Sequence, residues 1–333
     1  MNILITGASG FIGGFIVEKA LEEGLNVFAA VRKTSSKKYL KDPRINFIEI
    51  DFSNCEKLTK QLEDFSKENG SIDYVIHNAG VTKVLSEKEY NKVNFEYSKN
   101  LVEAIIKSGH KLKKFVFVSS LAASGPGQHN TDKPISLLDL PKPVTEYGRS
   151  KLKTEEYLKG LSNFPYVIMR PPAVFGPRDA DMFSFFKLIS NKLEIYIGSN
   201  LQYLSFIYVK DLASAIIRAT TSQVQQKIYF ISDNQTYTNV IFSERIKVLM
   251  DKKTFVIKLP MFLVNIVAFL SENAGKLTKK PSPLNVDKIN ELKCSNWLCD
   301  ASSFYLDTDF KVQYTLDKGI EETIKWYKDE KWL

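Results

Sequence analysis

A glycine-rich turn close to the N-terminus limits the folds open to this sequence more than any other feature. An apolar run over residues 2–6 leads into the motif TGASGFIG at residues 6–13, and a helical pattern runs from Phe11 to Glu23. Glycines at a strand-to-helix turn let the backbone bend sharply, and the helix N-terminus attracts an anion. The turn therefore predicts a dinucleotide site, because the diphosphate of such a cofactor needs this close approach. The residues expected to contact it are Gly7, Ser9, Gly10, Phe11, Ile12 and Gly13.

The rest of the first half alternates short apolar runs with helical patterns. Continuous apolar strands separated by helices are typical of a parallel sheet covered on both faces, and right-handed crossovers make such units doubly wound. We therefore predict an α/β protein with a Rossmann sheet and a smaller C-terminal lobe for the substrate. The expected strands are residues 2–6, 26–31, 45–50, 74–77, 115–118, 166–169 and 227–231.

The predicted lobes each use two stretches of the chain. Residues 1–172 and about 205–231 form the expected dinucleotide-binding core. Residues 173–204 and 232–333 form the expected substrate lobe, because the regular alternation of strands and helices loosens after Phe164. Since no low-complexity linker separates them, we expect the lobes to be closely packed.

Composition and charge exclude several classes of protein. The 46 Lys and Arg against 38 Asp and Glu give a formal charge of +8, and 44% of the residues are apolar. The lysines form short clusters without the aromatic-rich basic stripe of a nucleic-acid binder. Cys55, Cys294 and Cys299 contain no CxxC pair and are odd in number, which favours reduced thiols. Because no secretory signal pattern opens the sequence, we expect a cytoplasmic protein without nucleic-acid partners or a metal site.

One apolar stretch, LPMFLVNIVAFL at residues 259–270, raises the question of a membrane. A helix of this length rises only about 18 Å, less than the ~30 Å hydrocarbon core of a bilayer. We therefore expect no transmembrane segment, and we interpret the stretch as a buried helix or a pocket wall. Its composition also allows weak contact with a membrane surface.

Two serines and a Tyr-x-x-x-Lys motif are the candidate catalytic groups. Ser119 and Ser120 follow the expected strand 115–118, and Tyr147 and Lys151 lie near the start of a later helix. Residues four apart lie on one helix face, so the phenol and the ammonium can serve one site. A nearby cation favours the phenolate, and we expect Lys151 to lower the pKa of Tyr147 from about 10. Tyr147 can then exchange a proton with an oxygen that a serine hydroxyl holds.

Together with the GxxGxxG spacing of the first turn, these groups resemble the extended branch of the short-chain dehydrogenase/reductase superfamily, which includes the NAD-dependent epimerases and dehydratases. The resemblance continues in HNAG at residues 77–80, RPPAVFGPR at 170–178, VKDLA at 209–213 and the closing segment 319–327. It implies that Ser120, Tyr147 and Lys151 are the catalytic residues. It also implies that the cofactor contacts Asp51, Phe52, Asn78, Ala79, Gly80, Asn94, Tyr147, Lys151 and Pro172.

Arg32 bears on the choice of cofactor. It ends the second expected strand, about 20 residues past the glycines, where dinucleotide folds read the adenosine ribose. An acidic residue there would accept a hydrogen bond from the ribose and repel a 2′-phosphate, whereas Arg32 offers a planar cationic fork, with Lys33 close behind. The sequence therefore favours NADP(H) and leaves NAD(H) open.

Departures from the sugar-converting relatives bear on the substrate. The resemblance implies an Asp-Glu pair after the catalytic serine or threonine of a dehydratase, where this chain has Leu121 and Ala122. It implies an asparagine in an epimerase where this chain has Ala173. The chain therefore looks most like reductases of the dihydroflavonol-reductase and 3β-hydroxysteroid-dehydrogenase type. In that interpretation, aromatic residues such as Phe186 and Phe206 form the wall of an apolar cavity.

The function expected from the sequence is that of an NAD(P)-dependent oxidoreductase. It would transfer a hydride between NADP(H) and a carbonyl or secondary alcohol of a small, mostly apolar molecule. A nucleotide-sugar epimerase with tightly bound NAD is the first alternative, for which Arg178 and Lys187 are candidate phosphate ligands. A non-catalytic NADP-binding regulatory protein is the second. A homodimer through the helices that start near Asn91 and Tyr147, as in relatives, is also open.

Overall fold

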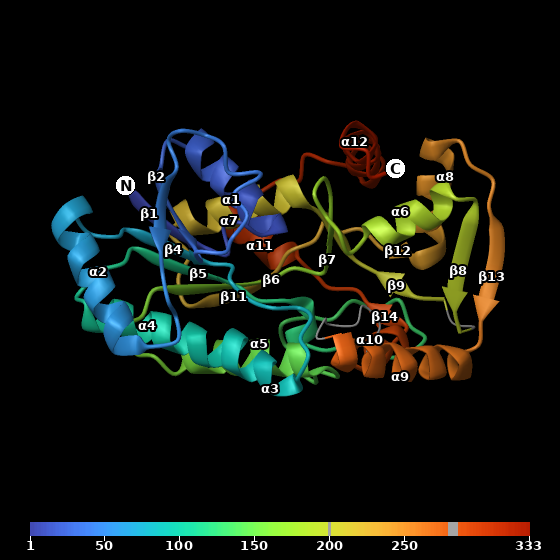
Figure 1. Ribbon diagram of the computed structural model, residues 1–333, viewed down its shortest axis with the longest axis horizontal. Helices are drawn as coiled ribbons and strands as arrows, with labels where there is room; N and C mark the ends of the chain where they lie inside the picture. Colours follow the sequence, from blue (N-terminus) through green and yellow to red (C-terminus); the bar gives the residue numbers. More distant parts are fainter. Residues whose placement is uncertain (199–200, 279–285) are drawn as a thin grey trace.

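The computed structural model describes residues 1–198, 201–278 and 286–333, which form two lobes side by side (Figure 1). A seven-stranded sheet with the order β11-β6-β5-β4-β1-β2-β3 forms the first lobe, and all neighbouring strands are parallel. The chain runs outward from β1 in both directions, which is the order of a doubly wound sheet and confirms the predicted fold class. The strands are β1 (Asn2–Thr6), β2 (Asn26–Val31), β3 (Asn46–Glu49), β4 (Tyr74–His77), β5 (Lys114–Val118), β6 (Tyr166–Arg170) and β11 (Lys227–Phe230).

Helices cover both faces of this sheet (Figure 1). One face packs against α1 (Phe11–Glu22), α7 (Val209–Thr221) and α11 (Ser302–Thr308). The opposite face packs against α2 (Cys55–Asn69), α4 (Tyr97–Lys107) and α5 (Glu146–Lys159). The strands read as continuous apolar runs because both faces are buried. Short helical turns complete this lobe: α3 (Glu87–Tyr90), the π-helical η1 (Asn91–Glu96) and the 3₁₀ turn η2 (Leu121–Ala123).

The second lobe consists of short sheets of two or three strands and of helices, most of which surround an aromatic core. Phe186 and Phe206 are fully buried in that core, so they are not available as walls of an apolar cavity. The elements are β7 (Ala173–Phe175), α6 (Phe183–Ser190), β8 (Leu193–Ile197), β9 (Tyr203–Leu204), β10 (Phe206–Tyr208), β12 (Tyr237–Thr238), α8 (Asn239–Met250), β13 (Phe255–Leu259), α9 (Met261–Thr278), α10 (Val286–Leu292), β14 (Asn296–Trp297) and α12 (Leu316–Asp329).

The exact boundaries of the two lobes stay a prediction. The C-terminal part of the chain contributes to both lobes. Phe304 and Phe310 pack into the core beneath α1 and α7. Phe304 meets the ring of Tyr229 on β11, with 5.2 Å between the ring centroids. The segment that carries α11 therefore returns to the Rossmann sheet before α12 crosses to the second lobe.

The apolar stretch 259–270 becomes the end of β13 and the first half of α9. Val264 and Ala268 are buried, as expected of a buried helix, but Phe262, Ile266 and Leu270 are 62%, 52% and 61% exposed. The interpretation as a wholly buried helix is therefore wrong. No helix among the described residues has the length and apolar character needed to span a bilayer.

Candidate active site

The glycine turn shows why its positions need glycine. Gly7 has a φ of +68°, and a Cβ there would lie 2.8 Å from the backbone of Asn78 and Ala79 on the neighbouring strand end. A Cβ on Gly13 would lie 2.0 Å from the Gly7 carbonyl oxygen. The helix α1 begins after Gly10 without a side-chain cap, which leaves its first amides free for an anion. These features fit the diphosphate of a dinucleotide cofactor.

A line of buried hydrogen bonds joins β1, β4 and α4 behind this turn. The Thr6 hydroxyl lies 2.8 Å from His77 Nδ1 and accepts from the Ala79 amide, and His77 Nε2 lies 2.7 Å from the Ser98 hydroxyl. Since Ser98 donates to the Asn94 carbonyl at 2.7 Å, His77 must carry its proton on Nε2 and accept from Thr6 on Nδ1. Burial, aided by the charge of Lys151, lowers the pKa of His77 to about 3. His77 is therefore a neutral structural group.

The side chain of Asn94 links this line to the catalytic helix. It lies in η1, and π-helical turns are frequent at functional sites. Its amide oxygen accepts from the Val81 amide at 2.8 Å, and its amide nitrogen donates to the Ser150 hydroxyl at 3.0 Å. A Cβ on Gly80 would lie 3.0 Å from Asn94 Oδ1 and 3.3 Å from Lys151 Nζ. The structure thus brings these three predicted cofactor residues together, while their contacts with a cofactor stay a prediction.

The predicted catalytic residues come together at the carboxyl end of β5. Ser120 precedes η2 and accepts from the Ala122 amide at 3.1 Å, and its hydroxyl hydrogen-bonds the phenol of Tyr147. Lys151 is buried, donates to the Val118 carbonyl at 2.9 Å and has its pKa lowered by burial to about 8. Ser120 and Tyr147 are thus placed to contact one oxygen atom.

The pKa of Tyr147 differs from the sequence-based expectation. The pKa is raised to about 12, chiefly by burial and in smaller part by the charge of Glu291, although the hydrogen bond with Ser120 acts in the opposite direction. The expected lowering by Lys151 was wrong, because desolvation of the phenolate outweighs the stabilising groups around it. At neutral pH the phenol of Tyr147 carries its proton.

A buried ion pair supports the serine end of the site. The Arg170 guanidinium donates to both oxygens of the Glu155 carboxylate at 2.5–3.1 Å, and both side chains are at most 5% exposed. Ser119 donates to the same carboxylate at 2.5 Å, and Arg170 also donates to Ser124 at 2.8 Å. This network fixes the backbone on both sides of Ser120. Glu155 follows Lys151 by one helical turn, a spacing that the sequence analysis passed over.

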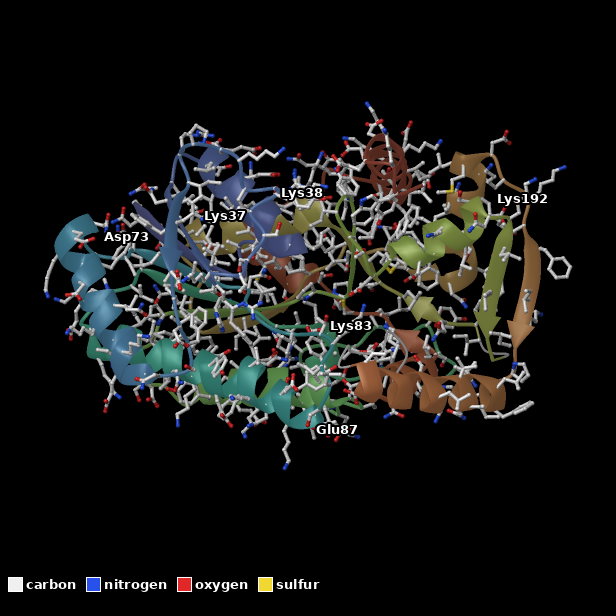
Figure 2. All side chains as sticks on the ribbon, viewed as in Figure 1. Lys37, Lys38, Asp73, Lys83, Glu87 and Lys192 are labelled. Atoms are coloured by element: carbon white, nitrogen blue, oxygen red, sulfur yellow. The ribbon has the colours of Figure 1, made fainter. Side chains whose placement is uncertain are left out.

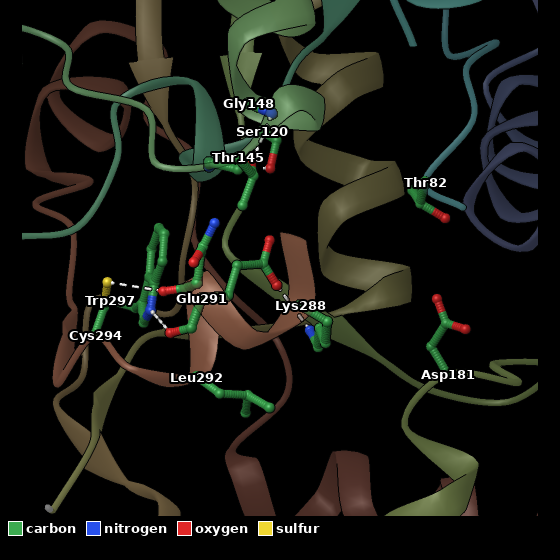
Figure 3. Close-up of polar contacts among 12 residues, drawn as sticks. Thr82, Ser120, Thr145, Gly148, Asp181, Lys288, Glu291, Leu292, Cys294 and Trp297 are labelled. Atoms are coloured by element: carbon green, nitrogen blue, oxygen red, sulfur yellow. Dashed lines mark hydrogen bonds and ion pairs between the residues drawn. The ribbon is translucent and has the colours of Figure 1, made fainter. Parts of the chain in front are cut away.

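The second lobe reaches the catalytic helix through α10, which the sequence analysis missed. The Asp287 carboxylate accepts from the amides of Glu146 and Tyr147 at 3.0–3.3 Å and so caps α5 from outside. Glu291 forms an ion pair with Lys288 at 2.8 Å, and Figure 3 shows both side chains extending from α10 below Ser120 and Thr145. No local pattern could have revealed these contacts, since about 140 residues separate Asp287 from its partners in α5.

The two predicted phosphate ligands have other contacts in the structure. Lys187 is exposed on α6, and its ammonium lies 5.7 Å from the centroid of the Phe183 ring. Arg178 pairs with Glu18 on α1 at 2.8 Å, and its guanidinium lies 4.4 Å from the Phe15 ring and 4.7 Å from the Tyr39 ring. Arg178 is therefore engaged with the dinucleotide lobe. Lys83, near the centre of the molecule in Figure 2, pairs with Asp181 across the boundary between the lobes.

The predicted cofactor residues Arg32 and Asp51 lie just after β2 and β3. Arg32 is exposed and forms no ion pair with any described residue; its amide donates to the Ser35 hydroxyl at 3.0 Å. Lys37 and Lys38 follow in the same loop (Figure 2). The Asp51 carboxylate accepts from the amide and hydroxyl of Ser53, which lowers its pKa. Phe52 and Pro172 are half-buried at the same edge of the sheet, where parallel strands present their carboxyl ends.

Comparison with known proteins identifies the family. The sequence model of the NAD dependent epimerase/dehydratase family matches residues 3–232. The chain belongs to this family. A ceramide reductase of Caulobacter vibrioides is 25% identical over 99% of this chain and 96% of its own length. A UDP-glucose 4-epimerase of Vibrio cholerae is also 25% identical, over 97% of this chain and 94% of its own length.

Solved structures with similar chains share the fold. The UDP-glucose 4-epimerase of Thermotoga maritima, solved with UDP-glucose, has a TM-score of 0.80 at 22% identity, and the match covers 99% of both chains. The range matched by the family model, residues 3–232, includes the glycine turn, Ser120, Tyr147 and Lys151. Because a reductase and an epimerase are equally similar to this chain, the reaction has to be argued from its own residues.

Proposed function

We propose that this chain is an oxidoreductase that interconverts a carbonyl group and a secondary alcohol on a largely apolar substrate, with NADP(H) as the cofactor. The observation that carries the proposal is that Ser120, Tyr147 and Lys151 meet at the carboxyl end of β5, where the phenol of Tyr147 holds its proton. Reduction of a carbonyl needs a proton donor at the oxygen, and a phenol with a raised pKa holds its proton until that oxygen becomes basic.

Each catalytic residue has one task in this reaction. A bound nicotinamide supplies or takes up the hydride. Ser120 donates a hydrogen bond that fixes the substrate oxygen, and Tyr147 Oη delivers the proton to the same oxygen. Lys151 has a pKa of about 8, so most of its ammonium groups are charged at neutral pH and stabilise the negative charge that the lost proton leaves on the phenol. Its remaining hydrogens are available to cofactor hydroxyls.

The segment after Ser120 argues against elimination of water. Leu121 and Ala122 are buried, and the Leu121 amide donates to the Pro171 carbonyl at 2.8 Å. A carboxylate pair at these positions would be buried without partners, at a cost of several kcal/mol per ion. Dehydration needs an acid and a base at these positions. The lack of such a pair at Leu121 and Ala122 supports a reaction limited to hydride and proton transfer.

The choice of NADP(H) rests on Arg32. Its exposed guanidinium stands at the end of β2 with no carboxylate partner among the described residues, and such a fork matches a 2′-phosphate. NAD(H) has no 2′-phosphate, so its binding would need no cation at this position.

The proposal of an apolar substrate is supported by the lack of free polar side chains that would bind a sugar diphosphate at Ala173 and Arg178. Ala173 has no polar side chain, and Arg178 is held by Glu18, Phe15 and Tyr39. The similarity to a protein named ceramide reductase points in the same direction.

A nucleotide-sugar epimerase with tightly bound NAD is the second candidate. The Lys288–Glu291 pair favours it, because the Glu291 carboxylate is close enough to act on the charge of Tyr147, and a charged pair near the reacting group suits the hydroxyl groups of a sugar. The similarity to UDP-glucose 4-epimerases adds to that candidate.

One pair of assays separates the two candidates. Purified protein is incubated with NADPH and a series of ketones that runs from polar to long-chain apolar, with NADH as the matched control. In parallel, UDP-glucose and UDP-N-acetylglucosamine are incubated without added cofactor, and the epimers are measured. Consumption of NADPH that increases with chain length supports the proposal. Epimer formation without added cofactor would overturn it in favour of the epimerase.

A further inference from the structure

The helix α9 is apolar on the side that faces away from the protein. Its buried side chains, Val264 and Ala268, pack with Ile289 of α10. The outward side carries what we call the α9 face: Phe262, Leu263, Ile266, Val267 and Leu270, which are 62%, 40%, 52%, 55% and 61% exposed. Surface helices normally present polar residues on this side. With about 3.6 residues per turn, the five side chains share one side of the helix, and they form a continuous apolar surface of the kind that marks an interaction site.

The charge around the α9 face identifies the partner. The helix carries no charged residue from Met261 to Ser271, and the chain as a whole has a charge of +8. Lys258, just before α9, and Lys293, just after α10, are both exposed. An uncharged apolar helix face that follows an exposed lysine, on a chain with a net positive charge, matches the interface of an anionic bilayer, where apolar side chains enter the headgroup region and lysines meet negative lipids.

A second copy of this chain is a weaker match. Apolar patches of this kind cover on the order of a few hundred Å², which is less than the ~800 Å² that each partner buries in a standard interface. A bilayer sets no such minimum, because the apolar side chains enter it one by one.

The α9 face is directly connected to the catalytic helix. The helix α9 packs against α10, and α10 places Asp287 on the first amides of α5 and Glu291 beside Tyr147. In Figure 1, α9, α10 and α5 follow one another along the same edge of the molecule. A surface bound by the α9 face therefore lies on the side of the molecule where the catalytic helix begins.

We propose that the α9 face docks on an anionic lipid bilayer and that the substrate is a lipid taken from that bilayer. The docking stands on the α9 face alone, whereas the nature of the substrate rests on the proposed function. The helix lies in the plane of the interface, and its five apolar side chains contact the acyl chains.

Vesicle binding by the full chain tests the docking. The protein is sedimented with vesicles of phosphatidylcholine alone and of phosphatidylcholine mixed with phosphatidylglycerol. We expect binding to the mixed vesicles that weakens as salt is added. The double variant Ile266→Asp/Leu270→Asp is expected to lose about tenfold or more of this binding, because it puts two carboxylates into the apolar face. Leu306→Asp on α11, where the native leucine is 81% exposed, is the matched control and should bind like the unmodified protein.

Three outcomes would overturn the docking. The first is no binding of the unmodified protein to either vesicle, and the second is equal binding of the double variant, with circular dichroism showing both proteins folded. The third is a dimer in sedimentation velocity that the double variant dissociates, which would assign the α9 face to a second copy.

Turnover separates this inference from the proposed function. The double variant should reduce a water-soluble ketone at the unmodified rate and a vesicle-borne ketone more slowly. Vesicle binding without turnover of either ketone would contradict the proposed reaction and leave the docking standing. Equal rates of the double variant and the unmodified protein on the vesicle-borne ketone would overturn the lipid as substrate.

Discussion

The two lobes reach the site around Tyr147 in different ways. On the dinucleotide side, short hydrogen bonds between buried groups run from Thr6 through His77 to Asn94. On the other side, α10 contributes two partly buried carboxylates, Asp287 and Glu291, and its neighbour α9 is open to solvent along an apolar face. The first arrangement is tied to the sheet, and a change in it disturbs several strands. The arrangement on the other side depends on single side chains of α10. The residues on the substrate side can therefore be substituted while the sheet remains the same.

The largest effect is expected from Tyr147, where the lobes meet. Tyr147→Phe removes the proton donor and should lower kcat by about a hundredfold or more, while NADPH binding, measured by fluorescence titration, stays within about twofold because the phenol acts mainly in the transition state. Tyr90→Phe, whose ring lies 6.1 Å from that of Tyr147, is the control for a lost hydroxyl nearby. A Tyr147→Phe protein with the unmodified rate would assign the proton to another group.

Arg32 tests the cofactor side alone. Arg32→Asp should weaken NADPH binding by about tenfold or more, since a charge-assisted contact to phosphate contributes ~1.5–3 kcal/mol, and should leave NADH binding nearly unchanged. Dissociation constants for both cofactors are measured by isothermal titration calorimetry. Lys33→Asp, one residue further along the same loop, controls for the general loss of positive charge. Equal affinities for NADPH and NADH in the unmodified protein would refute the preference.

Asp287 tests whether the second lobe holds the catalytic helix in place. Asp287→Ala leaves the amides of Glu146 and Tyr147 uncapped, which should cost about 1 kcal/mol, lower the melting temperature by about 2 °C and reduce kcat a few-fold. Asp287→Asn keeps a side-chain oxygen and caps about as well, so it should be close to the unmodified protein in both measurements. Loss of kcat in both variants, with the melting temperature unchanged, would show that Asp287 acts by its charge and not as a cap.

The smallest effect is expected from Glu291. Its charge raises the pKa of Tyr147, so Glu291→Gln lowers that pKa. Reduction needs the protonated phenol, and its rate is lost as the pH rises through this pKa. Lys151, with its pKa of about 8, gives the first alkaline limb of the pH profile for kcat. The second and more alkaline limb, which Tyr147 gives, should move to lower pH by less than about one unit. Glu321→Gln on the exposed side of α12 is the control, and a shift of the second limb to higher pH in Glu291→Gln would contradict the assignment.

The sequence predicted the dinucleotide side well because its signals are local. The glycine turn, the apolar strands and the Tyr-x-x-x-Lys spacing each lie within a few residues of one another, and the structure places Ser120, Tyr147 and Lys151 together as expected. The seven strands lie within one or two residues of the predicted ranges. A strand buried on both faces leaves a continuous apolar run that can be read without any knowledge of its neighbours.

The remaining features depend on contacts between distant segments. The helix predicted to start near Asn91 begins with the π-helical η1, in which Asn94 hydrogen-bonds the Val81 amide and the Ser150 hydroxyl. The roles of Asp287 and Glu291 follow from where α10 lies, which no local pattern encodes. The apolar run in α9 predicts a buried helix or a pocket wall and leaves weak membrane contact open, because its composition alone does not show which of its side chains the rest of the protein covers.

His77 has a consequence for the behaviour of the protein in acid. The imidazole is neutral when folded, with a pKa of about 3, whereas an exposed histidine takes up a proton near pH 6.5. Between these values only the unfolded chain gains the proton, so the free energy of unfolding declines as the pH falls below about 6.5, by on the order of a few kcal/mol in all. The junction of β1 and β4 beside the glycine turn is thus a weak point towards acid, and urea unfolding at about pH 7 and about pH 5 should show the difference. Acidification therefore weakens the fold through the one imidazole that joins Thr6 of β1 to Ser98 of α4 behind the glycine turn.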